Sequence, residues 1–75
     1  MIPYRDKSGR SGVSYYEIGP DWIKLMFKTD RHIYLYTYDM PGEEEVETMK
    51  DLATKGKGLT TYVNKYVREN YHAKS

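Results

Sequence analysis

The strongest constraint on the fold is a pair of short segments in which side chains alternate between apolar and polar. Residues 22–28, WIKLMFK, place Ile23, Leu25 and Phe27 on one side of a strand. Residues 32–38, HIYLYTY, alternate again after a turn of three residues. Alternation with a period of two is typical of strands with one buried face, and a short connection between two of them favours an antiparallel hairpin.

One more strand and two helices complete the predicted fold. Residues 13–18, VSYYEI, predict a strand before the hairpin, and residues 43–53 carry apolar side chains at helical spacing after an acidic first turn. Residues 59–71 predict a second helix, separated from the first by Gly56 and Gly58. We expect its apolar stripe in the core: Leu59, Tyr62, Val63, Tyr66 and Val67. The predicted fold class is α+β, a three-stranded antiparallel meander followed by two helices packed on one sheet face (β-β-β-α-α).

The length of the chain allows one domain. A chain of 75 residues buries only about 60% of its unfolded surface, and without cysteine it has no disulfide to supplement the core. Residues 1–10 are mostly polar, so we expect a mobile N-terminal tail and a single domain over residues 11–75. The sequence shows neither a signal-like segment nor an apolar run of membrane-spanning length, and we expect a cytoplasmic protein without a membrane partner.

The alternating segments also predict the face of the sheet that the helices leave open. If Ile23, Leu25, Phe27, Ile33 and Leu35 lie under the helices, the opposite side chains lie on the open face. These are Lys24, Met26, Lys28, Tyr34, Tyr36 and Tyr38. Rings beside cations are typical of surfaces that stack single-stranded nucleic acid, and tyrosine and methionine are enriched at protein interfaces. Cross-strand pairing of rings with lysine stems explains the same pattern without a ligand.

Charge is segregated along the chain although the net charge is only +1. Residues 43–53 hold five carboxylates against Lys50, whereas residues 54–75 hold five basic side chains against Glu69. A basic region of this kind predicts binding to the phosphates of RNA or DNA. The predicted contacts are Lys55, Lys57, Thr61, Asn64, Lys65 and Arg68. The alternative is a protein partner or a homodimer bound through the tyrosine-rich open face.

The parts of this basic region also have structural explanations. Gly56 can end a helix, so that its flanking lysines only solvate the loop. Asn64 can bond to backbone, and Arg68 can pair with an acid such as Glu17 or Asp39. The sequence leaves both explanations open.

No pattern in the sequence indicates catalysis. His32 and His72 lie forty residues apart, no serine has the context of a nucleophile, and no histidines show metal-ligand spacing. The run of glutamates that begins at Glu43 is typical of a solvated helix start. We therefore expect no enzyme activity, no catalytic residues, no metal, no cofactor and no small-molecule substrate.

Residues 11–71 resemble the KTSC domain, a small module found alone in bacterial and phage proteins and at the C-terminus of some lysyl-tRNA synthetases. The similar features are Ser11-x-Val13, Phe27-Lys28, Tyr34 with Tyr36, Met40-Pro41, and Tyr62-x-Asn64-x-x-Val67-Arg68-x-x-Tyr71 after a Lys-Gly turn. Extra residues around 57–61 and a shorter first hairpin depart from the family pattern. The resemblance implies an association with RNA, through the tRNA ligases that carry the module, and marks Asn64 and Arg68 as residues of interest.

Overall fold

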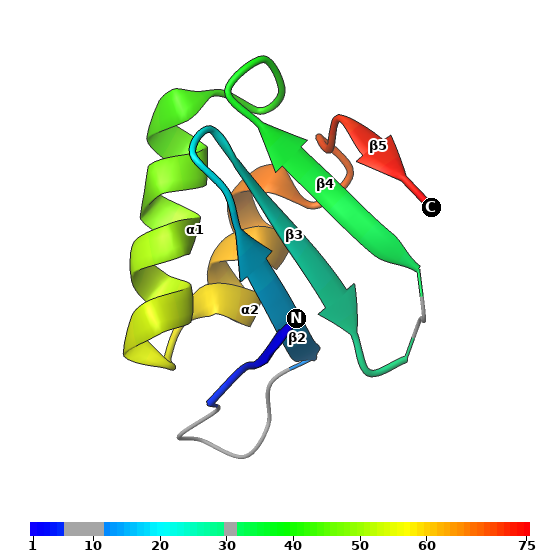
Figure 1. Ribbon diagram of the computed structural model, residues 1–75, viewed down its shortest axis with the longest axis vertical. Helices are drawn as coiled ribbons and strands as arrows, with labels where there is room; N and C mark the ends of the chain where they lie inside the picture. Colours follow the sequence, from blue (N-terminus) through cyan, green and yellow to red (C-terminus); the bar gives the residue numbers. More distant parts are fainter. Residues whose placement is uncertain (6–11, 30–31) are drawn as a thin grey trace.

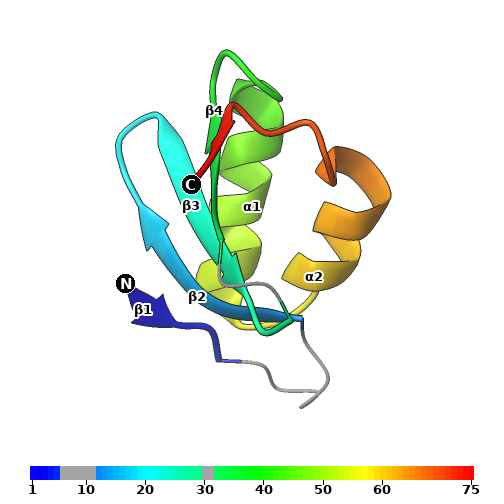
Figure 2. The ribbon, with the colours of Figure 1, turned by 90° about the vertical axis from the view of Figure 1, so that its right-hand side faces the viewer.

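The chain folds into two layers, a five-stranded antiparallel sheet and a helical layer. The computed structural model describes residues 1–5, 12–29 and 32–75. Helix α1 (Glu43–Lys55), the short helix α2 (Leu59–Tyr62) and the π-helical segment η1 (Val63–Val67) lie on one side of the sheet. Figures 1 and 2 show this arrangement, in which no described element covers the other side of the sheet. The predicted α+β class, with an antiparallel sheet and two helical elements, is confirmed.

The sheet contains the three predicted strands in their sequence order. They are β2 (Val13–Ile18), β3 (Trp22–Phe27) and β4 (Ile33–Thr37). Neighbouring strands are antiparallel, with Tyr16 opposite Leu25 and Ile23 opposite Tyr36. The predicted turn at residues 29–31 falls partly outside the described residues, because residues 30 and 31 are not described.

Two short strands extend the meander to five and correct the prediction of three. Strand β1 (Ile2–Pro3) pairs with β2, and β5 (Ala73–Lys74) pairs with β4, which gives the order β1-β2-β3-β4-β5. Each has only two residues, and two residues are too short for any alternation to be recognised.

The predicted mobile tail over residues 1–10 differs from the structure for residues 1–5. Tyr4 is buried in the core, and its hydroxyl accepts a hydrogen bond of 3.2 Å from the backbone N–H of Leu59. Tyr4 also packs edge-on against Tyr16 at 6.5 Å between ring centroids. Residues 6–10 lie outside the described residues. The N-terminal segment therefore joins the sheet to the helical layer.

The second helix ends earlier than the predicted residue 71. After four α-helical residues the chain widens into the π-helical turn of η1, which ends at Val67. The hydroxyl of Tyr36 donates a hydrogen bond of 3.2 Å to the carbonyl oxygen of Arg68, directly after this turn. His72 then donates its backbone N–H to Leu35, and the chain continues into β5.

Strand β4 presents the opposite face to the one predicted. Because Leu25 lies opposite Tyr34 and Ile23 lies opposite Tyr36, both tyrosines face the helices. Tyr36 is fully buried, while Ile33 and Leu35 lie on the open face. Shifting the alternation of a strand by one residue exchanges all of its side chains between the two faces. The helix-facing position of Tyr36 suits tyrosine because its phenol donates a hydrogen bond to the Arg68 carbonyl oxygen at the edge of the core.

Among the described helices, none is both long enough and apolar enough to cross a membrane.

Candidate functional site

A groove of about 320 Å³ opens between the sheet and the second helical segment, which consists of α2 and η1. It lies where η1 passes over the ends of β3 and β4. Its lining combines polar and aromatic side chains: Gly12, Phe27, Thr29, Tyr34, Thr60, Val63, Asn64, Arg68, Glu69, Tyr71 and Lys74. Two of the predicted anion-binding residues, Asn64 and Arg68, are therefore part of one groove.

The helical wall of the groove presents Asn64 and Arg68 side by side. The two residues are one turn apart, and a guanidinium N–H of Arg68 donates a hydrogen bond of 3.2 Å to the Asn64 side-chain oxygen. Within the described residues no carboxylate pairs with Arg68, so the pairing with Glu17 or Asp39 that the sequence left open is absent. The guanidinium is exposed and has further N–H groups to offer to an anion.

The opposite wall is aromatic. The ring of Tyr34 contacts Phe27 and Tyr71 edge-on, at 5.2 and 5.1 Å between centroids. The ammonium group of Lys74 lies 5.4 Å from the centre of the Tyr34 ring. Sequence reasoning missed Lys74, because only the pairing of β5 with β4 places it beside Tyr34.

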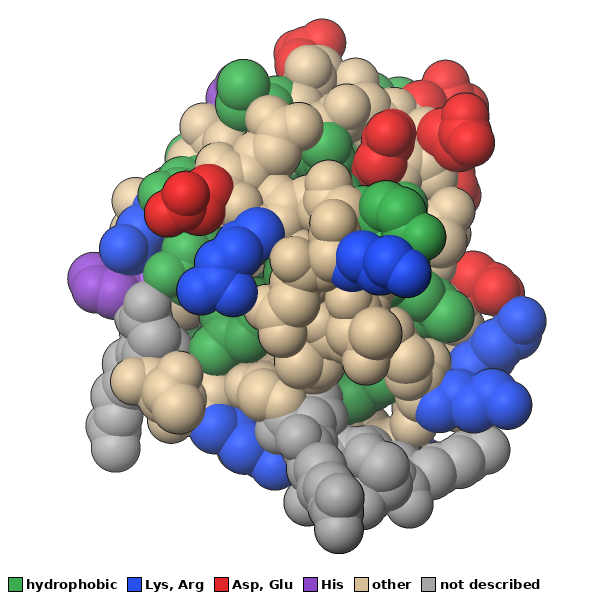
Figure 3. Space-filling model, turned by 180° about the vertical axis from the view of Figure 1, so that it is seen from behind, with side chains coloured by type: hydrophobic (Ala, Val, Ile, Leu, Met, Phe, Trp, Pro, Cys, Tyr) green, Lys and Arg blue, Asp and Glu red, His purple; other side chains and the backbone are tan. Residues whose placement is uncertain are grey.

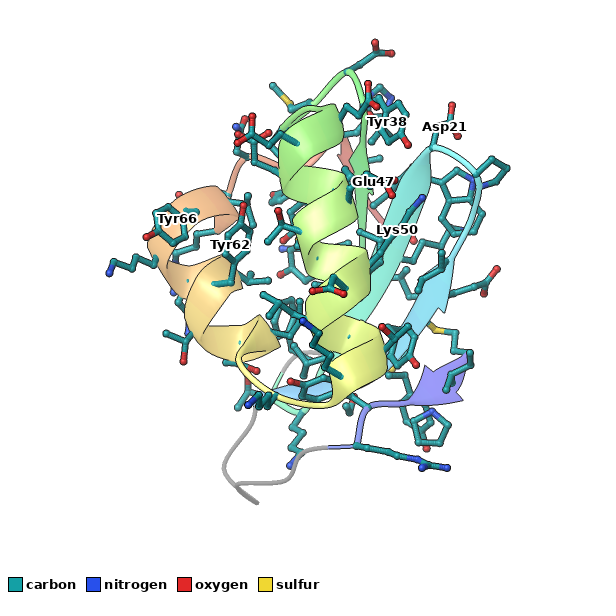
Figure 4. The ribbon with its side chains drawn as sticks, turned by 90° about the vertical axis from the view of Figure 1, so that its left-hand side faces the viewer. Asp21, Tyr38, Glu47, Lys50, Tyr62 and Tyr66 are labelled. Atoms are coloured by element: carbon teal, nitrogen blue, oxygen red, sulfur yellow. The ribbon has the colours of Figure 1, made fainter. Side chains whose placement is uncertain are left out.

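Thr61 and Lys65 are exposed on the same helical segment but do not line the groove. The Lys65 ammonium lies 5.6 Å from the ring centre of Tyr66. Tyr66 is 61% exposed, so its predicted place in the core is wrong, and it packs on the half-buried Tyr62 at 4.9 Å. Figure 4 shows both rings on the second helical segment, with Tyr62 on the side that faces α1. The wider π-helical turn changes the direction of Tyr66 from that of an ideal α-helix.

The Lys-Gly-Lys-Gly loop, which supplies two of the predicted anion-binding residues, lies outside this groove. Gly56 ends α1 in the left-handed conformation, with φ of 74°, and its N–H bonds to carbonyl oxygens of the last turn. Lys55 forms a 2.8 Å ion pair with Asp51. Lys57 is exposed, and neither lysine lines the groove. The loop is a glycine cap whose lysines lie outside the candidate site.

The predicted interface of lysines and tyrosines is divided between the two faces. Lys24 and Met26 lie on the open face, whereas Tyr34 and Tyr36 lie under the helices, and Lys28 follows the end of β3. Burial raises the pKa of the Tyr36 phenol.

The third tyrosine of that set, Tyr38, belongs to a small network on the helical side. Its hydroxyl donates a hydrogen bond of 2.7 Å to Glu47, which raises the pKa of Tyr38 to about 12. Lys50 forms a 2.8 Å ion pair with Glu47 and donates to the carbonyl oxygen of Pro20 at 3.0 Å. Figure 4 shows these side chains bridging α1 and the hairpin between β2 and β3. This network ties the two layers together.

Charge is divided across the helix-covered face. In Figure 3 most acidic side chains gather towards the end where α1 begins, and most basic ones lie lower, over the second helical segment and the loop before it. A shallow acidic hollow on α1 is lined by Glu43, Glu44, Glu47, Thr48 and Asp51. Among residues 1–5, 12–29 and 32–75 no three His, Cys, Asp or Glu side chains are arranged to hold a metal ion.

Comparisons with protein-family models, curated proteins and solved structures found no match to this chain.

Proposed function

We propose that this protein is a small non-enzymatic module that binds single-stranded nucleic acid in the groove between η1 and the sheet. The observation that carries the proposal is the position of Arg68 and Lys74 on the walls of a groove that also presents aromatic rings. Basic side chains beside rings hold phosphates and stack bases without reading a sequence. Among the described residues that line the groove, Glu69 is the only other charged one, so these residues together carry a net positive charge.

The dimensions of the groove favour a short stretch of a single strand. A volume of about 320 Å³ is at the small end of the range for ligand pockets, whereas a duplex is usually bound by an extended surface. The exposed guanidinium suits a phosphate, since its N–H fork matches two phosphate oxygens. The KTSC-like pattern of Asn64 and Arg68, and the link of that family to tRNA ligases, support RNA as the first ligand to test.

The experiment is fluorescence anisotropy with labelled single-stranded RNA and DNA over a series of salt concentrations. Wild-type affinity should fall steeply as salt rises, and Arg68→Gln and Lys74→Gln should each lower the salt slope by about one. Lys55→Gln is the matched control, because Lys55 pairs with Asp51 outside the groove. It should leave the slope nearly unchanged.

Folding and binding can be separated in the same variants. Arg68 is exposed, and the only side-chain hydrogen bond described for it is with Asn64, so Arg68→Gln should shift the melting temperature very little. Absence of wild-type binding to any single strand at low salt would refute the proposal. Equal losses of oligonucleotide affinity in Lys55→Gln and Arg68→Gln would refute the groove as the binding site.

A further inference from the structure

The open face of the sheet combines apolar side chains with one acid and one base. The face residues follow from the register, because directly opposite residues share a face: Pro3, Tyr15, Glu17, Trp22, Lys24, Met26, Ile33, Leu35, Thr37 and Ala73. Tyr15 is 42% exposed, and Trp22, Met26, Ile33 and Leu35 are half-buried although no described element lies over them. A sheet face that leaves several large apolar side chains uncovered usually marks an interaction site.

The two charges on this face do not satisfy each other within one molecule. Glu17 lies directly opposite Lys24 in the register, yet within the described residues neither forms an ion pair. The Lys24 ammonium instead lies 5.1 Å from the centre of the Trp22 ring. The strands of the open face therefore carry one carboxylate and one ammonium without ion-pair partners, and their charges cancel.

We infer that this face binds a second copy of the chain, sheet against sheet, about a twofold axis that runs between β2 and β3. Such an axis places each residue of β2 over its register partner in β3 of the other copy. Glu17 of each copy then meets Lys24 of the other, and Tyr15 meets Met26. Sheets packed in this way lie about 10 Å apart, a distance that side chains from both faces fill.

A second copy fits the face better than other occupants. A neutral face offers no attraction to nucleic acid or to a strongly charged protein. Pairing of edge strands between two copies would form few backbone hydrogen bonds, because β1 and β5 have two residues each and Pro3 has no N–H to donate. The face is seen along the shortest axis in Figure 1, where the whole Cα trace spans 31 by 23 Å. The sheet face is only part of that outline and is therefore smaller than the roughly 800 Å² per partner of a standard interface. The expected dimer is therefore weak and forms as concentration rises.

The test is sedimentation velocity over a wide range of protein concentration, with two charge reversals. Wild type should show a concentration-dependent monomer–dimer equilibrium. Glu17→Lys and Lys24→Glu each bring like charges together in the homodimer and should weaken it at least about tenfold. An equimolar mixture of the two variants should regain dimerisation, because one copy then carries two cations where the other carries two carboxylates.

Glu44→Lys is the matched control, since Glu44 is exposed on α1, on the helical side of the sheet. It should leave the equilibrium unchanged. The only tryptophan, Trp22, lies on the proposed interface, so its emission should shift with concentration in wild type and, in the single variants, only at concentrations at least about tenfold higher. Wild type that stays monomeric at every concentration would overturn the inference. A dimer that neither charge reversal weakens, or a mixture of the two variants that fails to dimerise, would overturn the inference as well.

Discussion

The hydroxyl of Tyr36, in strand β4, donates a hydrogen bond of 3.2 Å to the carbonyl oxygen of Arg68, the residue that follows η1. This bond joins the sheet to the helical segment beside the groove. The carbonyl groups at the end of a helix lack partners within the helix. The phenol of the fully buried Tyr36 satisfies one of them. The position of the Arg68 backbone thus depends on a side chain from the core.

Tyr36→Phe should destabilise the fold by about 1–3 kcal/mol, because the Arg68 carbonyl oxygen loses its donor while the ring remains. Urea unfolding measures the change. The variant should also weaken oligonucleotide binding, since Arg68 is then less well positioned. Tyr15→Phe is the control, because Tyr15 is exposed and no hydrogen bond to its phenol is described. Equal stability of both variants would contradict the role given to the Tyr36 hydroxyl.

Tyr4→Phe should cost about 1–3 kcal/mol, because the buried N–H of Leu59 loses its acceptor. Tyr4→Ala should cost about 3 kcal/mol or more, since it also leaves a cavity in the core. Ile2→Ala, at a side chain that is 52% exposed, should change stability by less than about 0.5 kcal/mol. Thermal unfolding of the three variants distinguishes a docked N-terminal segment from a free one, for which all three would behave alike.

Gly56→Ala should destabilise the protein by about 1–3 kcal/mol more than Gly58→Ala. Both glycines have positive φ, 74° and 80°, so both substitutions strain the backbone. A Cβ on Gly56 would in addition collide with the backbone carbonyl oxygen of Arg5, while one on Gly58 meets only a Leu52 methyl group at 3.7 Å. Urea midpoints give the comparison. Similar losses at both positions would mean that residues 4 and 5 do not pack on the loop.

Stability should decrease in acid partly through Glu47. Hydrogen bonds from Lys50 and then Tyr38 lower the pKa of Glu47 below its ordinary value of 4.5. A carboxyl group whose pKa is lower in the folded state stabilises the fold above pH 4.5, and this stabilisation is lost as pH falls through the folded-state pKa. Glu47→Gln should therefore flatten the dependence of stability on pH below 4.5. Glu44→Gln, for an exposed side chain on the same helix, should not flatten it.

Periodicity alone was sufficient for the elements that present one clearly apolar side. It predicted β2, β3 and β4 nearly to the residue, and α1 from its acidic first turn onward. These patterns succeed because burial of one face dictates a spacing of two or 3.6 residues. The proximity of Asn64 to Arg68 also followed from helical spacing, and the structure places both on one wall of the groove.

Tertiary structure alone decided which face of β4 is buried and where the ends of the chain pair. In β4 both faces offer large apolar surfaces, Ile33 and Leu35 on one and the tyrosines on the other, so alternation does not choose between them. The choice depends on partners remote in sequence, since buried phenols need acceptors such as the Arg68 carbonyl oxygen. Likewise β5 is too short to show a pattern, and it brings Lys74 to the groove only by pairing with β4. Local sequence encodes the spacing of an element, whereas its register and polar partners arise only when the whole chain packs.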